Sequence, residues 1–154
     1  MLMLPHDYPP IIDSEKARYR ILYVGEDQEF FRALRRILKW PEYHIVSCPH
    51  VGTAILFLEG NPRYELLVFE VEVRGKSGLK LARQTRSMAH RSNIPIVIVL
   101  PDELAVDINE RRRKREVNKW VCKEDVSTCI ETIMMLLAST RSRKSALGSG
   151  TASS

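Results

Sequence analysis

The chain has 154 residues, of which 44% are hydrophobic and 28% charged, and its formal net charge is +5 at pH 7. This length and composition suffice for one compact domain with an apolar core, without disulfides or bound metal. The most apolar segment, residues 94–100, is far shorter than the roughly 20 residues that a transmembrane helix needs. We therefore expect a single domain with no membrane insertion.

The N-terminal residues 1–18 contain paired prolines and mixed polarity, which predicts a loosely ordered extension. They lack a basic start followed by a continuous apolar core, so they do not resemble a secretory signal and we expect a cytoplasmic protein. Cys48, Cys122 and Cys129 are odd in number and do not have metal-ligand spacing. We expect them to be buried, reduced thiols.

Five segments of strand character alternate with five stretches of helical periodicity. The clearest helical stripe is the last, in which apolar residues recur with a period of three to four residues, and Asp125 is available as its N-cap. Asp27 is the expected N-cap of the first helix and Pro41 its stop. The predicted strands cover residues 20–24, 44–48, 65–71, 94–100 and 119–123. The predicted helices cover residues 28–40, 51–58, 79–89, 102–117 and 126–139.

This alternation predicts an α/β fold with a parallel sheet made of right-handed crossovers. For five strands the flavodoxin-like, doubly wound order is 2-1-3-4-5, and its switch point lies between strands one and three. That point brings Gly25, Glu26 and Asp27, which follow the first strand, close to Glu70 at the end of the third. The sequence therefore predicts an acidic pocket formed by Glu26, Asp27 and Glu70.

Two basic segments account for the positive charge. Residues 110–116 carry a net +3 and residues 141–144 carry another +3, so the rest of the chain is near neutral. Beyond residue 139 the sequence is rich in Ser, Gly and Ala, which predicts a disordered tail or linker over residues 139–154.

Residues 19–138 resemble the receiver domain of bacterial two-component response regulators. The resemblance rests on spacing: Gly78 follows Glu70 by eight residues, Leu100 ends the fourth strand, and Lys123 ends the fifth, with Trp120 three residues before it. In that family the third strand ends on a phosphoacceptor Asp. The resemblance implies that Glu70 takes the phosphoacceptor position and that Leu100, Trp120 and Lys123 take the switch positions.

The residues that would perform the family's reaction differ from the family pattern. Glu70 replaces the phosphoacceptor Asp, Leu100 replaces a Ser or Thr, Gly25 replaces the first of two adjacent acids, and Glu124 replaces the usual Pro. Only Lys123 is unchanged. The resemblance thus implies a degenerate receiver, or pseudo-receiver.

These replacements predict weak or absent Mg²⁺ binding and no other cofactor. Magnesium requires near-octahedral oxygen ligands, and Gly25 removes one carboxylate. Glu is one methylene longer than Asp, and a misplacement of about 1 Å can cost on the order of a hundredfold in rate. A register shift in which Glu26 and Asp27 form the acid pair is an alternative, although a shift of one residue reverses side-chain direction in a strand.

Glu70 itself has two interpretations. Either it is a solvated carboxylate at a strand end, or it forms a fixed ion pair with Lys123 that stands in for the phosphorylated state. We favour a contact between Glu70 and Lys123, which would contribute little stability if it were exposed.

Trp120 either packs on the fourth helix or anchors a partner, since Trp is frequent at interaction hot spots. The basic run is either a solvated helix face or a contact surface for an acidic protein. No aromatic residues or DNA-binding motif accompany these charges, so nucleic acid is the less favoured partner. The run consists of Arg111, Arg112, Arg113, Lys114 and Arg115.

The sequence therefore favours a non-enzymatic signalling module that acts through protein contacts without taking phosphate. Its expected partners are a histidine kinase or another signalling protein, or a second copy bound through the fourth helix, fifth strand and fifth helix. Two alternatives are a receiver that is still phosphorylated at an altered acidic site and a nucleic-acid-associated regulator that uses the basic fourth helix.

Overall fold

The computed structural model describes the backbone of residues 17–101 and 116–153, and the side chains of these residues as far as Thr140. Its main sheet has five parallel strands in the order β2-β1-β3-β6-β7. This confirms the predicted flavodoxin-like order. The strands are β1 (Tyr19–Val24), β2 (Tyr43–Cys48), β3 (Leu66–Glu70), β6 (Ile96–Leu100) and β7 (Lys119–Cys122).

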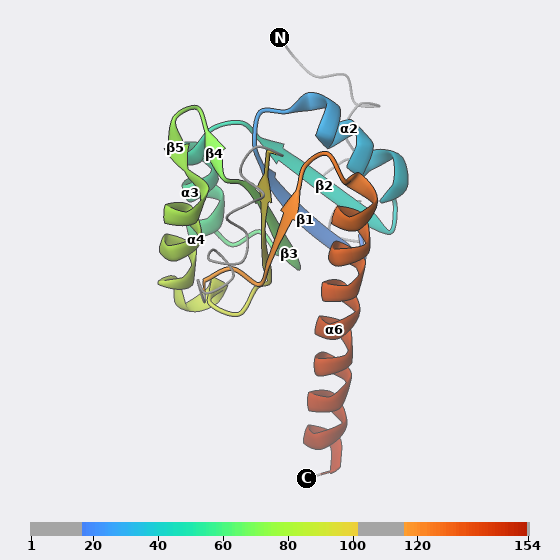
Figure 1. The fold of residues 1–154 in the computed structure, drawn as a ribbon. Helices are drawn as coiled ribbons and strands as arrows, with labels where there is room; N and C mark the ends of the chain where they lie inside the picture. The colour runs from blue at the N-terminus through green and yellow to red at the C-terminus, as the bar shows by residue number, and fades with distance from the viewer. Residues whose placement is uncertain (1–16, 102–115, 154) are drawn as a thin grey trace.

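Helices cover both faces of the sheet, with α2 and α6 on one face and α3 and α4 on the other (Figure 1). Each face has its own apolar core. Because successive strand residues point to opposite faces, Leu66 and Val68 enter the core beneath α2 and α6, while Leu67 and Phe69 enter the other. The helices are α2 (Gln28–Ile37), α3 (Val51–Glu59), α4 (Gly78–Arg86) and α6 (Val126–Ser153), with a short 3-10 helix at Ala89–Arg91.

The two predicted N-caps are present. The Asp27 carboxylate accepts a hydrogen bond from the Phe30 amide at 3.0 Å, and that of Asp125 accepts one from the Thr128 amide at 3.1 Å. Each satisfies an amide that has no partner within its own helix. Because both caps follow strands, they fix where α2 and α6 begin relative to the edge of the sheet.

The segment after β3 is a small hairpin, whereas the sequence predicts only a polar, glycine-containing loop. Strands β4 (Glu72–Val73) and β5 (Lys76–Ser77) pair antiparallel around Arg74 and Gly75, whose φ angles are 51° and 79°. Positive φ at both central residues characterises the type I′ turn, which suits the right-handed twist of a two-residue hairpin. The turn places Arg74 beside the end of β1.

At the C-terminus, α6 continues to Ser153 and extends beyond the body of the domain (Figure 1). The sequence predicts the end of this helix near residue 139 and a disordered tail beyond it, so the structure differs here. Residues 141–147 include Arg, Lys, Ala and Leu, which favour helix, and extending an existing helix is easier than nucleating a new one.

The predicted fourth helix, residues 102–117, lies almost entirely outside the described residues. Its basic run, Arg111–Arg115, therefore stays a prediction. Residues 116–118 lead directly into β7, and Val117 is buried in the core beside α3 and α4.

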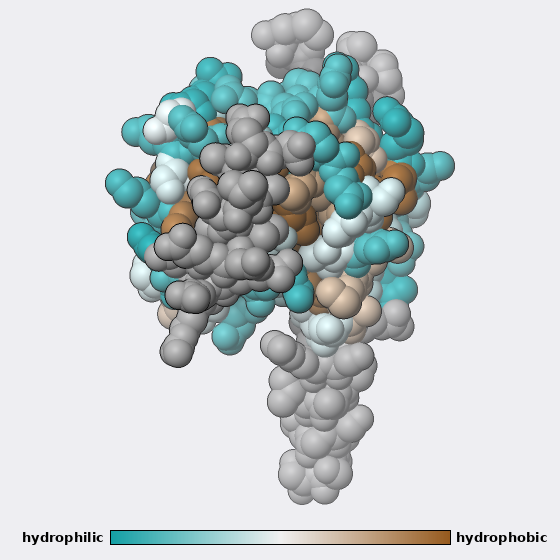
Figure 2. Space-filling model, in the orientation of Figure 1, coloured by the Kyte–Doolittle hydropathy of each residue, from teal (hydrophilic) through white to brown (hydrophobic). Residues whose placement is uncertain are grey.

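The described surface is largely hydrophilic on the face shown in Figure 2, with smaller apolar areas between the polar residues. No helix among the described residues is long and apolar enough to cross a membrane. The three cysteines form no disulfide, and Cys48 and Cys129 are buried as expected, whereas Cys122 is half-buried.

Candidate functional site

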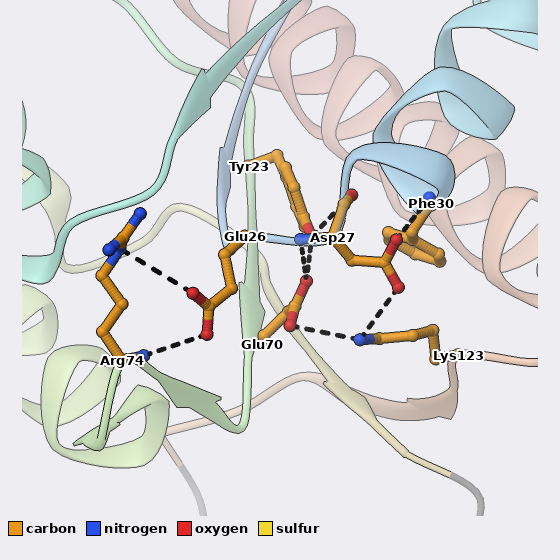
Figure 3. Close-up of polar contacts among 7 residues, drawn as sticks. All are labelled: Tyr23, Glu26, Asp27, Phe30, Glu70, Arg74 and Lys123. Atoms are coloured by element: carbon orange, nitrogen blue, oxygen red, sulfur yellow. Dashed lines mark hydrogen bonds and ion pairs between the residues drawn. The ribbon is translucent and has the colours of Figure 1, made fainter.

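Glu70 is buried at the carboxyl end of β3, with only 5% of its surface exposed. It is therefore not the solvated strand-end carboxylate of the first interpretation. The adjacent end of β1 and the end of β7 place three side chains around it, Tyr23, Asp27 and Lys123 (Figure 3). These residues come from separate parts of the chain, and the sheet brings them together.

Both oxygens of Glu70 have partners. The Tyr23 hydroxyl donates a hydrogen bond to Oε2, and the Asp27 amide donates a longer one to the same oxygen at 3.4 Å. The Lys123 ammonium donates to Oε1 at 3.3 Å. The expected contact between Glu70 and Lys123 is thus present, within a larger network.

Lys123 bridges two carboxylates. Its Nζ lies 3.2 Å from Asp27 Oδ2 and 3.3 Å from Glu70 Oε1. Burial acts to lower the pKa of Lys123, but the negative charges of Glu70 and Asp27 outweigh that effect and raise it above its usual value. The pKa of Asp27 is lowered, first by its hydrogen bond to the Phe30 amide and then, against the effect of burial, by Lys123. Asp27 and Lys123 are therefore both charged over the neutral pH range.

Gly25 lies directly beneath this network. A Cβ atom at this position would overlap the Glu70 carboxylate and the Tyr23 hydroxyl, and would lie 2.6 Å from Tyr23 Cζ. The space that a side chain at residue 25 needs is already filled. With Tyr23 and Glu70 in these positions, residue 25 has no room for a side chain.

Glu26 does not join the other two acids, which corrects the expected three-residue acidic pocket. Its carboxylate accepts a hydrogen bond from the Arg74 amide at 3.3 Å and lies 3.8 Å from the Arg74 guanidinium (Figure 3). Arg74 Nε also donates to the Pro49 carbonyl at 3.0 Å. The chain turns after β1 so that Asp27 caps α2 and faces Lys123 while Glu26 faces the β4-β5 hairpin. The two adjacent acids therefore do not converge on one point.

Gly78 has a packing reason for its position eight residues after Glu70. A Cβ atom there would overlap the Glu70 carbonyl oxygen and lie 3.4 Å from Val71 Cα. Its amide donates to the Val71 carbonyl at 2.8 Å. The chain passes this close because the hairpin brings the start of α4 back to the end of β3, where only glycine fits.

Leu100 and Trp120 both lie in the core beneath α3 and α4. Leu100 is fully buried, and Trp120 is 5% exposed. This burial disfavours the surface-anchor interpretation of Trp120, while the fourth helix on which it is expected to pack lies almost entirely outside the described residues. Leu100 still contributes its backbone to the site, because its carbonyl accepts a hydrogen bond from the Lys123 amide at 2.7 Å.

A groove of about 590 Å³ opens beside the network, between α2 and the start of α6. Asp27 and Lys123 belong both to the network and to the groove wall. Arg32 and Arg36 are exposed on α2, and neither forms an ion pair with any residue that the structure describes. The lining residues are Asp27, Glu29, Phe30, Arg32, Ala33, Arg36, Lys123, Glu124 and Val126.

Sequence reasoning missed Tyr23, Arg74 and this groove. The signal for Tyr23 is an aromatic residue two positions before a glycine, within the apolar segment Ile21–Val24. Arg74 gives no such signal, since its position depends on a hairpin that was not predicted. The charges of α2 were visible as the polar side of its helical stripe, and only the folded chain places them beside Lys123.

The donor set at this edge does not suit Mg²⁺. The oxygens of Asp27 and Glu70 face an ammonium group, and the carboxylate of Glu26 faces a guanidinium. No group of three or more His, Cys, Asp or Glu side chains among the described residues could hold a metal ion. A divalent cation would have to displace these positive charges before it could coordinate.

Comparison with solved structures identifies the same fold in response regulators. The receiver domain of the TMAO respiratory system response regulator TorR matches with a TM-score of 0.66 at 16% identity, over 79% of this chain and 98% of that one. A CheY-like receiver domain protein from Methanospirillum hungatei JF-1 matches at 0.63 and 18% identity, over 81% and 98%. The phosphorylated cyanobacterial phytochrome response regulator RcpA matches at 0.63 and 17%, over 76% and 89%.

No known family model matches the sequence, and no curated protein matches it significantly. At identities this low the structural likeness shows the fold, which is that of CheY-like receiver domains.

Proposed function

We propose that this protein is a phosphorylation-independent signalling module of the response regulator type, which acts in the cytoplasm through protein contacts and not as an enzyme. The observation that carries the proposal is the buried bridge from Glu70 through Lys123 to Asp27. If Glu70 takes the phosphoacceptor position, as the resemblance implies, this bridge supplies a carboxylate and its counter-charge there without phosphate. The fold of the neighbours supports a signalling role in general.

The surroundings of Glu70 disfavour phosphoryl transfer. Both of its oxygens are engaged, and the carboxylate is buried beneath Tyr23, so an approaching donor would have to break these contacts first. Transfer also requires positioning, for which an error of about 1 Å can cost on the order of a hundredfold. Leu100 provides no hydroxyl for a phosphoryl oxygen.

The partner contact we propose lies along the groove beside Lys123. The groove carries both signs of charge, from Arg32, Arg36 and Lys123 and from Asp27, Glu29 and Glu124. Arg32 and Arg36 form no ion pair with a described residue, so they are the cations that an acidic protein segment would meet. Such a segment would also reach Lys123 and Asp27, so binding and the Glu70 network would affect each other. A histidine kinase or another signalling protein is the proposed class of partner. Met134 and Met135, exposed on α6, are available for the alternative, a homodimer through the fourth helix, β7 and α6.

The deciding experiment is incubation of the protein with Mg²⁺ and a small phosphodonor, followed by intact mass spectrometry. We expect no added phosphoryl mass, while a conventional receiver in the same mixture gains one. A phosphorylated peptide containing Glu70 or Asp27 would favour the alternative, a receiver still phosphorylated at an altered site. The variant Glu70→Asp should stay unmodified too, because Gly25 and Leu100 are unchanged in it.

A further inference from the structure

Tyr23 is the least expected member of the Glu70 network. Its side chain is fully buried at the end of β1, and its ring packs 5.7 Å from that of Phe30 and 5.9 Å from that of Phe31. The two aromatic contacts hold the ring in place, and the hydroxyl at its tip donates to Glu70 Oε2. The oxygen that Lys123 does not use is therefore engaged from the opposite side.

Gly25 directly follows β1, and its amide still donates to the Cys48 carbonyl of β2 at 3.0 Å, so its position continues the alternation of the strand on the side of Tyr23. The Tyr23 ring extends along that side until its tip lies over Gly25. Its Cζ atom would be 2.6 Å from a Cβ atom at residue 25, which is too short for a contact between two non-bonded carbon atoms. Glu70 fills the rest of the space, because its carboxylate reaches the same point from β3.

We propose that Tyr23 is a positioning residue that closes this edge of the sheet to a divalent cation, and that residues 23, 25 and 70 form a matched set that can change only together. The ring occupies the place where a side chain at residue 25 would stand, and the hydroxyl holds the Glu70 carboxylate across the opening. The proposal extends the proposed function, because a site without a cation has no means of assisting phosphoryl transfer.

The chemistry of the phenol supports this arrangement. Burial, followed by the hydrogen bond to Glu70, raises the pKa of Tyr23 above its usual value. The hydroxyl therefore stays protonated at neutral pH and remains a hydrogen-bond donor there. A carboxylate at residue 25 would meet the Glu70 carboxylate in the same buried space, so Gly25→Asp alone adds both a steric overlap and a like-charge repulsion.

The matched set predicts how cation binding depends on residue 23. The test compares the double variant Gly25→Asp/Glu70→Asp with the triple variant that also carries Tyr23→Val, each titrated with Mn²⁺ and followed by calorimetry and electron paramagnetic resonance. We expect saturable binding by the triple variant at least tenfold tighter than by the double variant, and none by the wild type. Equal affinities of the double and triple variants, or no binding by the triple variant, would overturn the proposal.

A second measurement covers the case in which the triple variant does not fold. Gly25→Ala is introduced alone and together with Tyr23→Val or Tyr23→Phe, and the thermal midpoint of unfolding is compared within each pair. We expect a large drop beside Tyr23 and beside Phe, because Cζ alone blocks the position, and a smaller drop beside Val, where only the Glu70 carboxylate still meets the added methyl group. An equal drop in all three backgrounds would show that the ring does not occupy this space.

The outcomes separate this inference from the proposed function. If the wild-type chain takes a phosphoryl group from a small donor, the proposed function fails whatever the Mn²⁺ titrations show. If the wild-type chain takes none and the double variant binds Mn²⁺ as well as the triple variant, the proposed function stands and the role of Tyr23 is wrong. Tyr43→Val, a change in a half-exposed tyrosine of β2, serves as the control for loss of an aromatic ring.

Discussion

The two ends of the sheet both bury charged side chains, but they use them differently. At the amino ends of the strands, Arg91 is 4% exposed and its guanidinium donates to main-chain carbonyls at the end of α3, at 2.9 Å to Leu58 and 3.0 Å to Gly60. At the carboxyl ends, the Lys123 ammonium pairs with two side chains of the described residues, those of Glu70 and Asp27. The first arrangement supplies donors to main-chain carbonyls of α3, and the second links side chains from three separate parts of the chain.

Arg91 shows the structural use of a buried charge most clearly. The last carbonyls of a helix have no partner within it, and a cation near the C-terminus also interacts favourably with the helix dipole. The guanidinium lies 5.1 Å from the centre of the Tyr64 ring, which adds a cation–π contact. Such a residue has no freedom to respond to a partner, whereas Lys123 sits in the wall of an open groove.

The largest effect should come from Arg91→Met. It leaves buried carbonyls of α3 without donors, so we expect the free energy of unfolding to fall by roughly 3 kcal/mol, since hydrogen bonds from charged groups contribute about 1.5 to 3 kcal/mol each. Urea denaturation measures this. Arg83→Met is the matched control, because Arg83 is an exposed partner of Glu116 and its loss should cost about 0.5 kcal/mol. If Arg91→Met and Arg83→Met lowered the free energy of unfolding equally, the structural role assigned to Arg91 at the amino ends of the strands would be wrong.

Lys123→Met should have the next largest effect. It leaves the buried Glu70 carboxylate without its counter-charge, and because Lys123 is about a quarter exposed we expect a loss of about 2 kcal/mol, below the range for a fully buried pair. Adding Glu70→Gln should restore part of that loss, since the uncompensated charge is removed. Arg74→Met, which breaks an exposed pair, is the control. A fully additive double variant would show that Glu70 and Lys123 do not interact.

The smallest effect concerns alkaline pH. Tyr23 and Lys123 both have a pKa that is higher in the folded chain than their usual values of 10.0 and 10.5. Their stabilisation is therefore complete below about pH 10 and is lost as the pH rises above it, because the unfolded chain releases these protons first. We expect the stability of Tyr23→Phe to fall less between pH 9 and about pH 11 than that of the wild type, measured as urea midpoints. Parallel pH profiles would contradict the environment described for Tyr23.

Much of the fold could be predicted from the chain. Strands β3 and β6 are buried along their whole length and, apart from Glu70, apolar, as central parallel strands are. Asp27 and Asp125 fix the starts of α2 and α6 through local capping. The hairpin at Arg74 was missed because an Arg-Gly pair is a weaker turn signal than Asn-Gly or Asp-Gly. The continuation of α6 was missed because its Ser and Gly content suggests disorder even though helix propagation from a packed N-terminal half requires little.

The site could be predicted only in part, for reasons visible in its residues. Glu70 and Lys123 were expected to meet, because the ends of parallel strands share an edge. Glu26 was expected to accompany Asp27, but adjacent residues beyond a strand end diverge when one of them becomes a helix cap. Tyr23 was not expected, because the direction of an aromatic ring depends on packing against Phe30 and Phe31.

By itself the sequence determined the order of strands and helices, the acid at the end of β3 and the lysine at the end of β7, since these depend on local periodicity and on topology rules with few exceptions. Only the tertiary structure decided that Glu70 is buried, that Gly25 lies beneath it and that Tyr23 fills the space between. These features depend on which atoms can occupy one small volume, to which the ends of two strands, β1 and β3, both contribute.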